Sequence, residues 1–308
     1  MLDIQEHIEL APLTTFKIGG PARYFIDVAT EDEIKTAVLW ARSNSQPFIV
    51  LAGGSNVLLP DAGLDALVIH ITSKKYIFEG SRLTAEAGCT LLDLIKRASL
   101  MGLGGWESLA GIPGTLGGAV RGNAGAFGTE IKDVFESAIA FNSVTFERKE
   151  FTNAECNFAY RHSFFKDNPE WIIVQTSVQL KKTEAGDSIG RIDNTIIERE
   201  RRHLQNVQAA GSYFTNPVAP DVVQKMFEQE KKAESREGRV PAGWLIEKVG
   251  MKGARVGGAI ASEQHPNYLV NTGTATTKDV LDLAAQIKVA VMERFTIRLQ
   301  EEAVVVRG

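Results

Sequence analysis

The chain has 308 residues, of which 44% are hydrophobic, and its formal net charge is −4. That is ample for a large core, and the slight negative charge gives no general attraction to nucleic acid or to an anionic membrane. The start, MLDIQEHIEL, lacks the cationic and apolar regions of a signal peptide, and no apolar run approaches the ~18 residues that span a bilayer. We therefore expect a cytoplasmic protein with neither nucleic-acid nor membrane partners.

The N-terminal region begins with the strand pattern RYFIDVA (23–29). Thr30 and Glu33 then form a capping-box pair, which predicts a helix over residues 31–44. The core face of this helix is predicted to consist of Ile34, Ala37, Val38 and Ala41. A further strand, PFIVLA (47–52), leads into a glycine turn, GGSN.

The middle of the chain continues with strands at ALVIHI (66–71) and RLTAEAG (82–88) and a helix over 90–102 that ends at Gly102. Two more strand patterns, SAIAFNS and WIIVQTSVQLKK, flank a polar and aromatic loop (152–169). The charged stretch 186–208 fits either a solvated helix or connector, or a basic segment that faces a ligand.

The last region contains a predicted helix over 219–232, the segment PAGWLIEKVGMKG and the terminal strand AVVVRG. Thr276 or Thr277 is expected to cap the helix VLDLAAQIKVAVMERF (280–295). The alternation of helices and strands indicates an α+β or α/β fold in three pieces.

Glycine is concentrated in residues 108–128, SLAGIPGTLGGAVRGNAGAFG, where it occupies seven of twenty-one positions. Such a run is not expected to form a helix interior or a central strand. Without a Cβ, however, backbone N–H groups can lie directly against a phosphate or a flat ring. Together with GGSN (53–56), this run predicts a large phosphate-bearing cofactor held mainly by backbone; the alternative is a set of tight turns.

Two common nucleotide motifs do not fit these loops. A P-loop needs a Lys-Ser/Thr pair, and GIPGTLGGA has no lysine. A Rossmann fingerprint needs glycine spacings that GGSN lacks. Runs of free N–H groups bind anions in other folds as well, so the phosphate prediction stands without either motif.

Six motifs in order resemble the UDP-N-acetylenolpyruvoylglucosamine reductase (MurB) family, and they extend over almost the whole chain. They are TTFKIGGPA (14–22), LAGGSNVLL (51–59), GIPGTLGGAVRGNAGAFG (111–128), YRHSFF (160–165), AGSYFTNP (210–217) and AGWLIEKVGMKG (242–253). The length and the lack of an obvious insertion resemble the shorter subclass of the family.

The resemblance implies an α+β fold of the vanillyl-alcohol-oxidase (PCMH) type, with two FAD-binding subdomains and a smaller substrate-binding domain. We expect the first subdomain at 1–72, joined by the terminal strand 303–308, the second at 73–202, and the substrate domain at 203–302. The resemblance also implies an FAD-dependent oxidoreductase (UDP-N-acetylmuramate dehydrogenase), which reduces UDP-N-acetylglucosamine enolpyruvate to UDP-N-acetylmuramate with NADPH. This reaction supplies peptidoglycan precursors, and hence cell-wall biogenesis, cell shape and cell division.

Three catalytic residues follow from the resemblance. Arg161 matches an arginine that grips the substrate carboxylate, and Ser212 matches a serine that protonates the α-carbon. Glu302 matches the catalytic glutamate, although its neighbour Glu301 leaves a one-residue ambiguity, since only one of the two can face the site.

The binding residues are carried over from the same motifs. Substrate contacts are expected from Tyr160, Asn216 and Gln264. Contacts with non-covalent FAD are expected from Gly53, Gly54, Ser55, Asn56, Gly111, Pro113, Gly114, Thr115, Gly117, Gly118, Asn123, Gly125 and Ala126. No metal site is expected, since Cys89 and Cys156 have no ligand partners at the right spacing. We expect a monomer.

The chain departs from the family pattern at two points. Thr215 stands where the family usually has a lysine, and the stretch RRHLQNVQ (201–208) lacks a second, phosphate-binding lysine. Arg202 and His203 are the candidates to replace it, and the preference for NADPH over NADH depends on which does so. The alternatives to a reductase are a flavin oxidase or dehydrogenase of the same fold and a non-catalytic UDP-sugar-binding protein.

Overall fold

The computed structural model describes residues 3–202 and 206–307, which form two compact units. Unit 1 is Met1–Ile8, Pro21–Gly54 and Leu64–Arg201, and unit 2 is Glu9–Gly20, Ser55–Gly63 and Arg202–Gly308. Each unit is therefore assembled from three separate stretches of chain. None of the helices formed by the described residues is long and apolar enough to cross a membrane.

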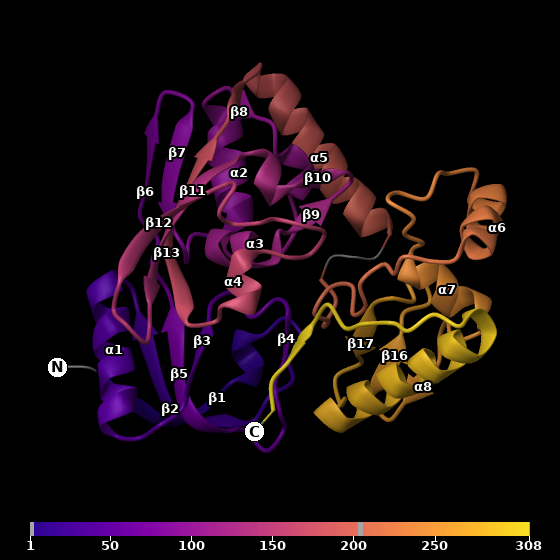
Figure 1. Cartoon of the computed structure of the whole chain (residues 1–308), viewed down its shortest axis with the longest axis horizontal. Helices are drawn as coiled ribbons and strands as arrows, with labels where there is room; N and C mark the ends of the chain where they lie inside the picture. The colour runs from indigo at the N-terminus through magenta and orange to yellow at the C-terminus, as the bar shows by residue number, and fades with distance from the viewer. Residues whose placement is uncertain (1–2, 203–205, 308) are drawn as a thin grey trace. The chain divides into compact units, whose positions relative to one another are not determined.

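The first sheet of unit 1 has the strand order β1-β2-β5-β3. Its strands are β1 (Gln5–Glu9), β2 (Pro21–Val28), β5 (Leu64–Ile71) and β3 (Phe48–Leu51). The mostly buried β5 is parallel to both of its neighbours. Helix α1 (Glu31–Ser43) connects β2 to β3 and buries the four predicted residues, and its capping box between Thr30 and Glu33 is present, so both predictions are confirmed (Figure 1).

The second sheet of unit 1 is antiparallel throughout, in the order β12-β11-β13-β7-β6. Its strands are β12 (Arg148–Thr152), β11 (Phe135–Asn142), β13 (Trp171–Gln179), β7 (Arg82–Glu86) and β6 (Tyr76–Glu79). Four helices belong to the same part of the chain: α2 (Leu91–Leu100), α3 (Leu116–Gly122), α4 (Phe164–Asp167) and α5 (Ala185–Arg201). Apolar side chains from this sheet and these helices form the larger core of unit 1, around the fully buried Trp106.

Short elements line the ends of this second sheet. Strand β8 (Leu103–Gly104) pairs with β14 (Lys181–Lys182), and β9 (Gly125–Ala126) pairs with β10 (Thr129–Glu130). Two single-turn 3-10 helices, η2 (Glu107–Leu109) and η3 (Ile131–Asp133), complete the unit.

The glycine-rich run contains a helix that the sequence analysis did not predict. Helix α3 occupies Leu116–Gly122 and buries Leu116, Ala119 and Val120. Three of its seven residues are glycine, which weakens an isolated helix by about 1 kcal/mol each relative to alanine. Packing against the second sheet outweighs that low propensity, so the expectation that the run is not helical was wrong at this point.

Unit 2 combines a three-stranded antiparallel sheet with three helices. The sheet is β15 (Arg255–Val256), β16 (Ala259–Ala261) and β17 (Leu269–Asn271), and the helices are α6 (Asp221–Lys231), α7 (Ala242–Lys248) and α8 (Thr277–Phe295). Thr276 is the residue that caps α8. Strand β4 (Val57–Leu58) runs parallel to β18 (Val304–Val305), and the 3-10 turn η1 (Ala11–Leu13) lies in the first stretch of the unit.

The core of unit 2 draws on all three of its stretches. Phe16 and Ile18 come from the first stretch, Leu58 from the second, and most of the remainder from residues beyond 209, such as Trp244 and Leu245. The predicted division into two FAD-binding subdomains and one substrate domain stays a prediction; the two sheets of unit 1 support it.

Helix α5 accounts for the charged stretch after residue 185. It buries Ser188, Ile192 and Arg199 and leaves most of its other charged side chains on the surface. The stretch is therefore a helix with a solvated face as far as Arg201, and its described residues 206–208 are not helical. His203, one of the two candidates for a phosphate-binding cation, lies outside the described residues.

Candidate functional site

The two glycine loops touch each other within unit 1. A Cβ built on Gly53 would lie 2.6 Å from Gly114 Cα, closer than real Cβ atoms approach a backbone atom. Gly54 and Gly114 adopt φ angles of 56° and 115°, which favour glycine. Loops that are 60 residues apart in the sequence thus form a single backbone surface.

This surface presents backbone N–H groups to a ligand. Among the described residues, no acceptor pairs with the N–H groups of Gly54, Gly114 or Thr115. Neighbouring N–H groups in glycine turns form concave nests that bind anions. The arrangement fits the diphosphate of FAD, and Gly53, Gly54, Gly114 and Thr115 are the predicted residues that would hold it.

Gly117 has a packing role, and its predicted contact with the cofactor stays a prediction. Its N–H donates to the carbonyl of Ala87 at 2.9 Å, and a Cβ on Gly117 would lie 2.6 Å from Ala87 Cβ. It therefore allows α3 to pack closely against the segment after β7. On the exposed side of the same turn, Gly118 donates its N–H to Thr115 Oγ1, which caps α3.

Asn123 has a structural role in this conformation, and its assignment to the cofactor stays a prediction. It is fully buried and closes α3 with a φ of 42°. Its Nδ2 donates to Glu130 Oε2 and to the carbonyl of Ala159, both at 2.9 Å, and its Oδ1 accepts the N–H of Lys132 at 3.2 Å. All of its side-chain groups are thus committed to holding neighbouring loops.

Arg161 lies beside the end of the glycine run. Its Nη2 donates to the carbonyl of Gly125 at 2.7 Å, and its guanidinium carbon lies 5.1 Å from the centre of the Tyr160 ring. Its backbone has a φ of 56°, and its carbonyl accepts Lys166 Nζ at 2.8 Å. The structure therefore brings together three predicted residues, Arg161, Tyr160 and Gly125.

Arg121 is a residue of this region that the sequence analysis missed. Burial lowers the pKa of its guanidinium, and its side chain has no partner among residues 3–202 and 206–307. Its carbonyl accepts Ser163 Oγ at 2.7 Å, which ties the end of α3 to the YRHSFF segment. A cation without a counter-charge in a partly buried position suits an anionic ligand. The position of Arg121 inside the glycine-rich run 108–128 is the feature of the sequence that could have identified it as a candidate site residue.

In unit 2, Ser212 and Glu302 lie on neighbouring segments. The N–H of Glu302 donates to the carbonyl of Tyr213 at 2.8 Å, and the N–H of Thr215 donates to the carbonyl of Gln300 at 2.9 Å. The two predicted residues are therefore held together by backbone hydrogen bonds. Gly211, with a φ of 72°, turns the chain just before Ser212.

Two asparagines fix this pair of segments. Asn267 is buried, donates its Nδ2 to the carbonyl of Phe214 at 2.8 Å and accepts the N–H of Phe214 at 3.0 Å. Asn56 donates its Nδ2 to the carbonyl of Glu302 at 3.2 Å, and its backbone carbonyl accepts the N–H of Val304 at 3.0 Å. The predicted cofactor residue Asn56 thus also positions the segment that carries Glu302.

The ambiguity between Glu301 and Glu302 is narrowed by the structure. Glu301 forms an ion pair with Lys288 of α8. This ion pair holds the Glu301 side chain against α8. Glu302 as the catalytic member of the pair stays a prediction, which this arrangement supports.

The remaining predicted residues differ in exposure and in their contacts. Asn216 accepts the N–H of Ala242 at 3.0 Å and so holds the start of α7, while Gln264 is exposed. Next to it, burial and then the charge of Arg202 lower the pKa of His265. Gly111 is buried and Ser55 half-buried, Pro113 is exposed, and Ala126 lies in β9.

Comparisons with known proteins agree with the geometry in each unit. Residues 22–145 match an FAD binding domain, and residues 202–306 match the C-terminal domain of UDP-N-acetylenolpyruvoylglucosamine reductase. The reductase of that name from Solibacter usitatus is 35% identical over 98% of this chain and 96% of its own length. The one from Flavobacterium johnsoniae is 36% identical over 99% of this chain and 100% of its own length.

A solved structure extends the similarity to three dimensions. The crystal structure of UDP-N-acetylenolpyruvylglucosamine reductase (MurB) from Thermus caldophilus superposes with a TM-score of 0.80, at 30% identity and with full coverage of both chains. The predicted α+β, FAD-binding fold class is confirmed. By sequence and by fold, the chain belongs to the UDP-N-acetylenolpyruvoylglucosamine reductase family.

Proposed function

We propose that this protein is an FAD-dependent oxidoreductase that reduces UDP-N-acetylenolpyruvoylglucosamine to UDP-N-acetylmuramate with NADPH, in peptidoglycan precursor synthesis. The observation that carries the proposal is the similarity to reductases of this name along the full length of both chains. The contact between Gly53 and Gly114 supports the cofactor, because it builds a backbone surface inside the segment that matches an FAD binding domain.

FAD, when bound, supplies the hydride chemistry of both half-reactions. The residues of the chain bind and orient the reactants and move the proton. The five histidines, at 7, 70, 162, 203 and 265, lie outside the glycine loops, which favours non-covalent binding.

Arg161 is proposed to grip the carboxylate of the enolpyruvyl group. Hydride addition to the terminal carbon places charge on that carboxylate, and a fixed guanidinium stabilises it through two hydrogen bonds. The hydrogen bond from Arg161 to the carbonyl of Gly125 supports this role, because it orients the side chain before substrate arrives. Arg121 adds positive charge to the same part of unit 1.

Ser212 is proposed to donate the proton to the α-carbon, with Glu302 beside it to supply or share that proton. A serine hydroxyl is a weak acid, so a neighbouring carboxyl group is a chemical requirement. The backbone hydrogen bond between Glu302 and Tyr213 supports the pairing. Asn216 and Gln264 are proposed to contact the UDP-sugar, and Arg202 to replace the missing phosphate-binding lysine.

The cellular setting is also a proposal. Both NADPH and UDP-sugars are cytoplasmic metabolites, so the reaction belongs in the cytoplasm, where it serves cell-wall growth, cell shape and division. We propose a monomer without nucleic-acid or membrane partners; sedimentation at several protein concentrations tests this, and a concentration-dependent shift contradicts it.

Spectroscopy of the purified protein tests the function. We expect bound flavin whose absorbance bleaches with NADPH and returns when UDP-N-acetylenolpyruvoylglucosamine is added without oxygen. A colourless protein that takes up no FAD contradicts the proposal. Flavin that is reoxidised by oxygen and not by the enolpyruvyl substrate points instead to an oxidase of the same fold.

A further inference from the structure

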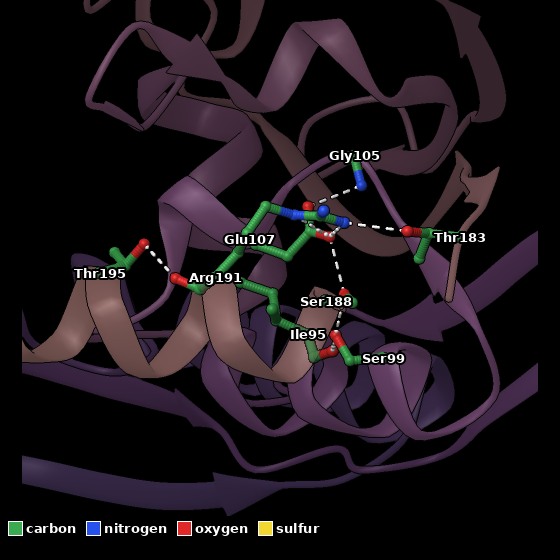
Figure 2. A network of polar contacts seen from close by, with 8 residues as sticks. All are labelled: Ile95, Ser99, Gly105, Glu107, Thr183, Ser188, Arg191 and Thr195. Carbon is green, nitrogen blue, oxygen red and sulfur yellow. Dashed lines mark hydrogen bonds and ion pairs between the residues drawn. The ribbon is translucent and has the colours of Figure 1, made fainter. Parts of the chain in front are cut away.

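Glu107 is a buried carboxylate that the proposed reaction does not use. Its side chain is 6% exposed and lies at the start of η2, inside unit 1 (Figure 2). Oε1 accepts hydrogen bonds from Ser188 Oγ and Arg191 Nη2, both at 2.7 Å, and Oε2 accepts the N–H of Gly105 at 2.8 Å. A buried charge is costly unless it is paired and hydrogen-bonded in this way.

The hydrogen bonds of Glu107 fasten η2 to two helices. Ser188 and Arg191 belong to α5, and Ser188 Oγ also bonds Ser99 Oγ of α2 at 2.7 Å. Arg191 Nη2 further donates to Thr183 Oγ1 at 3.0 Å. Figure 2 shows Ser188 and Arg191 beside the carboxylate, with Ser99 next to Ser188 and Thr183 next to Arg191.

The carboxylate of Glu107 also lies directly against the backbone of Gly104. A Cβ added to Gly104 would lie 2.3 Å from Glu107 Oε1, so the backbone closes over the oxygen. Burial raises the pKa of Glu107, but the hydrogen bonds from Ser188 and Arg191 and from the backbone outweigh it and leave the pKa at about 2. The group is thus charged at neutral pH.

The location of Glu107 connects this network with the glycine loops. Helix η2 ends at Leu109, two residues before Gly111, and η2 also packs against β9 and β10. The predicted cofactor residues Gly125 and Ala126 form β9. A single turn of helix therefore adjoins both the start and the end of the glycine run.

The glycine run needs such an external support. Glycine loses more conformational freedom on ordering than other residues, and a loop rich in it has few side chains with which to anchor itself. A charge-assisted network on a neighbouring turn adds a strong anchor to those that α3 and Asn123 provide.

We propose that Glu107, with Ser188 and Arg191 of α5, forms a positioning unit that holds residues 111–126 in the conformation that binds FAD. The inference rests on the proposed function in that FAD is the ligand of this loop. Glu107 is a positioning residue: it does not touch the cofactor, and it influences FAD binding by fixing η2.

The decisive variant is Glu107→Gln, which keeps the shape and removes the charge. We expect the Kd for FAD, measured by flavin fluorescence on titration of the flavin-free protein, to rise about tenfold, with faster release of FAD from the holoenzyme. Glu155→Gln is the matched control, because Glu155 also has a pKa of about 2 but pairs with Lys149 and the N–H of Thr152, which belong to β12 and not to the glycine run. Its Kd should equal that of wild type.

The outcomes separate this inference from the proposed function. A Glu107→Gln variant that is less heat-stable but binds FAD with unchanged Kd overturns the inference. Failure of the wild type and Glu155→Gln to bind FAD overturns the proposed function itself. If Glu107→Gln does not fold, the variants Ser188→Ala and Arg191→Gln test the inference instead. A rise of about threefold in the Kd for FAD supports it, and an unchanged Kd for FAD in both variants overturns it.

Discussion

The glycine loops of unit 1 and the Ser212–Glu302 segments of unit 2 are held in place by different chemistry. Glu107, a buried charge with an ion-pair partner, anchors the helical turn beside the glycine run. Neutral amides, Asn267 and Asn56, anchor the segments that carry Ser212 and Glu302. The carboxylate of Glu107 and the amide of Asn267 are both hydrogen-bonded, and these hydrogen bonds offset the cost of burying a polar group.

The difference has a functional meaning under the proposed reaction. A glycine-rich loop has fewer side chains with which to hold its own shape, and a strong charged anchor on a neighbouring turn adds to those it has. Segments that carry the reacting side chains are fixed by amides whose hydrogen bonds do not change with pH. Substitutions in the first region should therefore affect flavin binding, and those in the second should affect the chemical step or stability.

The largest expected effect belongs to Ser212→Ala. Reduction of the flavin by NADPH should be nearly unchanged, while reduction of the enolpyruvyl substrate should slow on the order of 10³-fold, because the proton donor is lost. Stopped-flow absorbance measures each half-reaction separately. Ser235→Ala, which removes a hydroxyl elsewhere in unit 2, is the control. Equal slowing of both half-reactions would break the proposed division between the regions.

Gly53→Ala should act on the other region. The added Cβ would lie 2.6 Å from Gly114 Cα, so the two loops must separate, and we expect FAD affinity to fall on the order of 100-fold. Gly190→Ala is the control, because nothing lies within 4 Å of its Cβ position in α5. Retention of FAD by Gly53→Ala with wild-type affinity would show that the contact between the loops is not needed.

Asn267→Ala sharpens the comparison through stability. It removes two hydrogen bonds and leaves the buried N–H and carbonyl of Phe214 without these partners, at an expected cost of about 2–3 kcal/mol in the free energy of unfolding. Urea denaturation measures this cost. A change below about 0.5 kcal/mol would mean that the amide is not an anchor.

The pH dependence should distinguish the charged anchor from the amides. The folded pKa of Glu107 is about 2, below the ordinary value of 4.5 for a glutamate, so its contribution to stability is present above about pH 4.5 and is lost as the pH falls towards 2. The stability difference between wild type and Glu107→Gln should therefore shrink over this range, whereas the difference for Asn267→Ala should not follow it. A difference for Glu107→Gln that stays constant with pH contradicts the charged anchor.

The smallest expected effect concerns Arg121. Arg121→Gln should weaken the binding of one anionic ligand about tenfold, because a partly buried counter-charge is removed. FAD titration and the KM for the enolpyruvyl substrate show which ligand it serves. Unchanged values for both would leave Arg121 with no role in binding.

The sequence predicted regular elements and motifs well where local chemistry decides them. The capping box at Thr30 and the buried face of α1 follow from local pattern alone. Helix α3 could not be predicted from local pattern, because its stability comes from the close packing of Gly117 against Ala87, a contact between residues 30 positions apart. The motif assigned Asn123 to the cofactor site. In the structure its side-chain amide forms hydrogen bonds with Glu130, Ala159 and Lys132, and no rule of sequence spacing predicts these contacts.

The interleaved path of the chain limits how the protein can be divided for experiments. A fragment that begins at Arg202 would contain most of unit 2 but would lack Phe16, Ile18 and Leu58, whose side chains are buried in its core. Such a fragment would expose the apolar surface those residues normally cover, and it should be prone to aggregation when expressed alone. Supplying residues 9–20 and 55–63 through designed linkers is the minimum needed for an autonomous version of this unit.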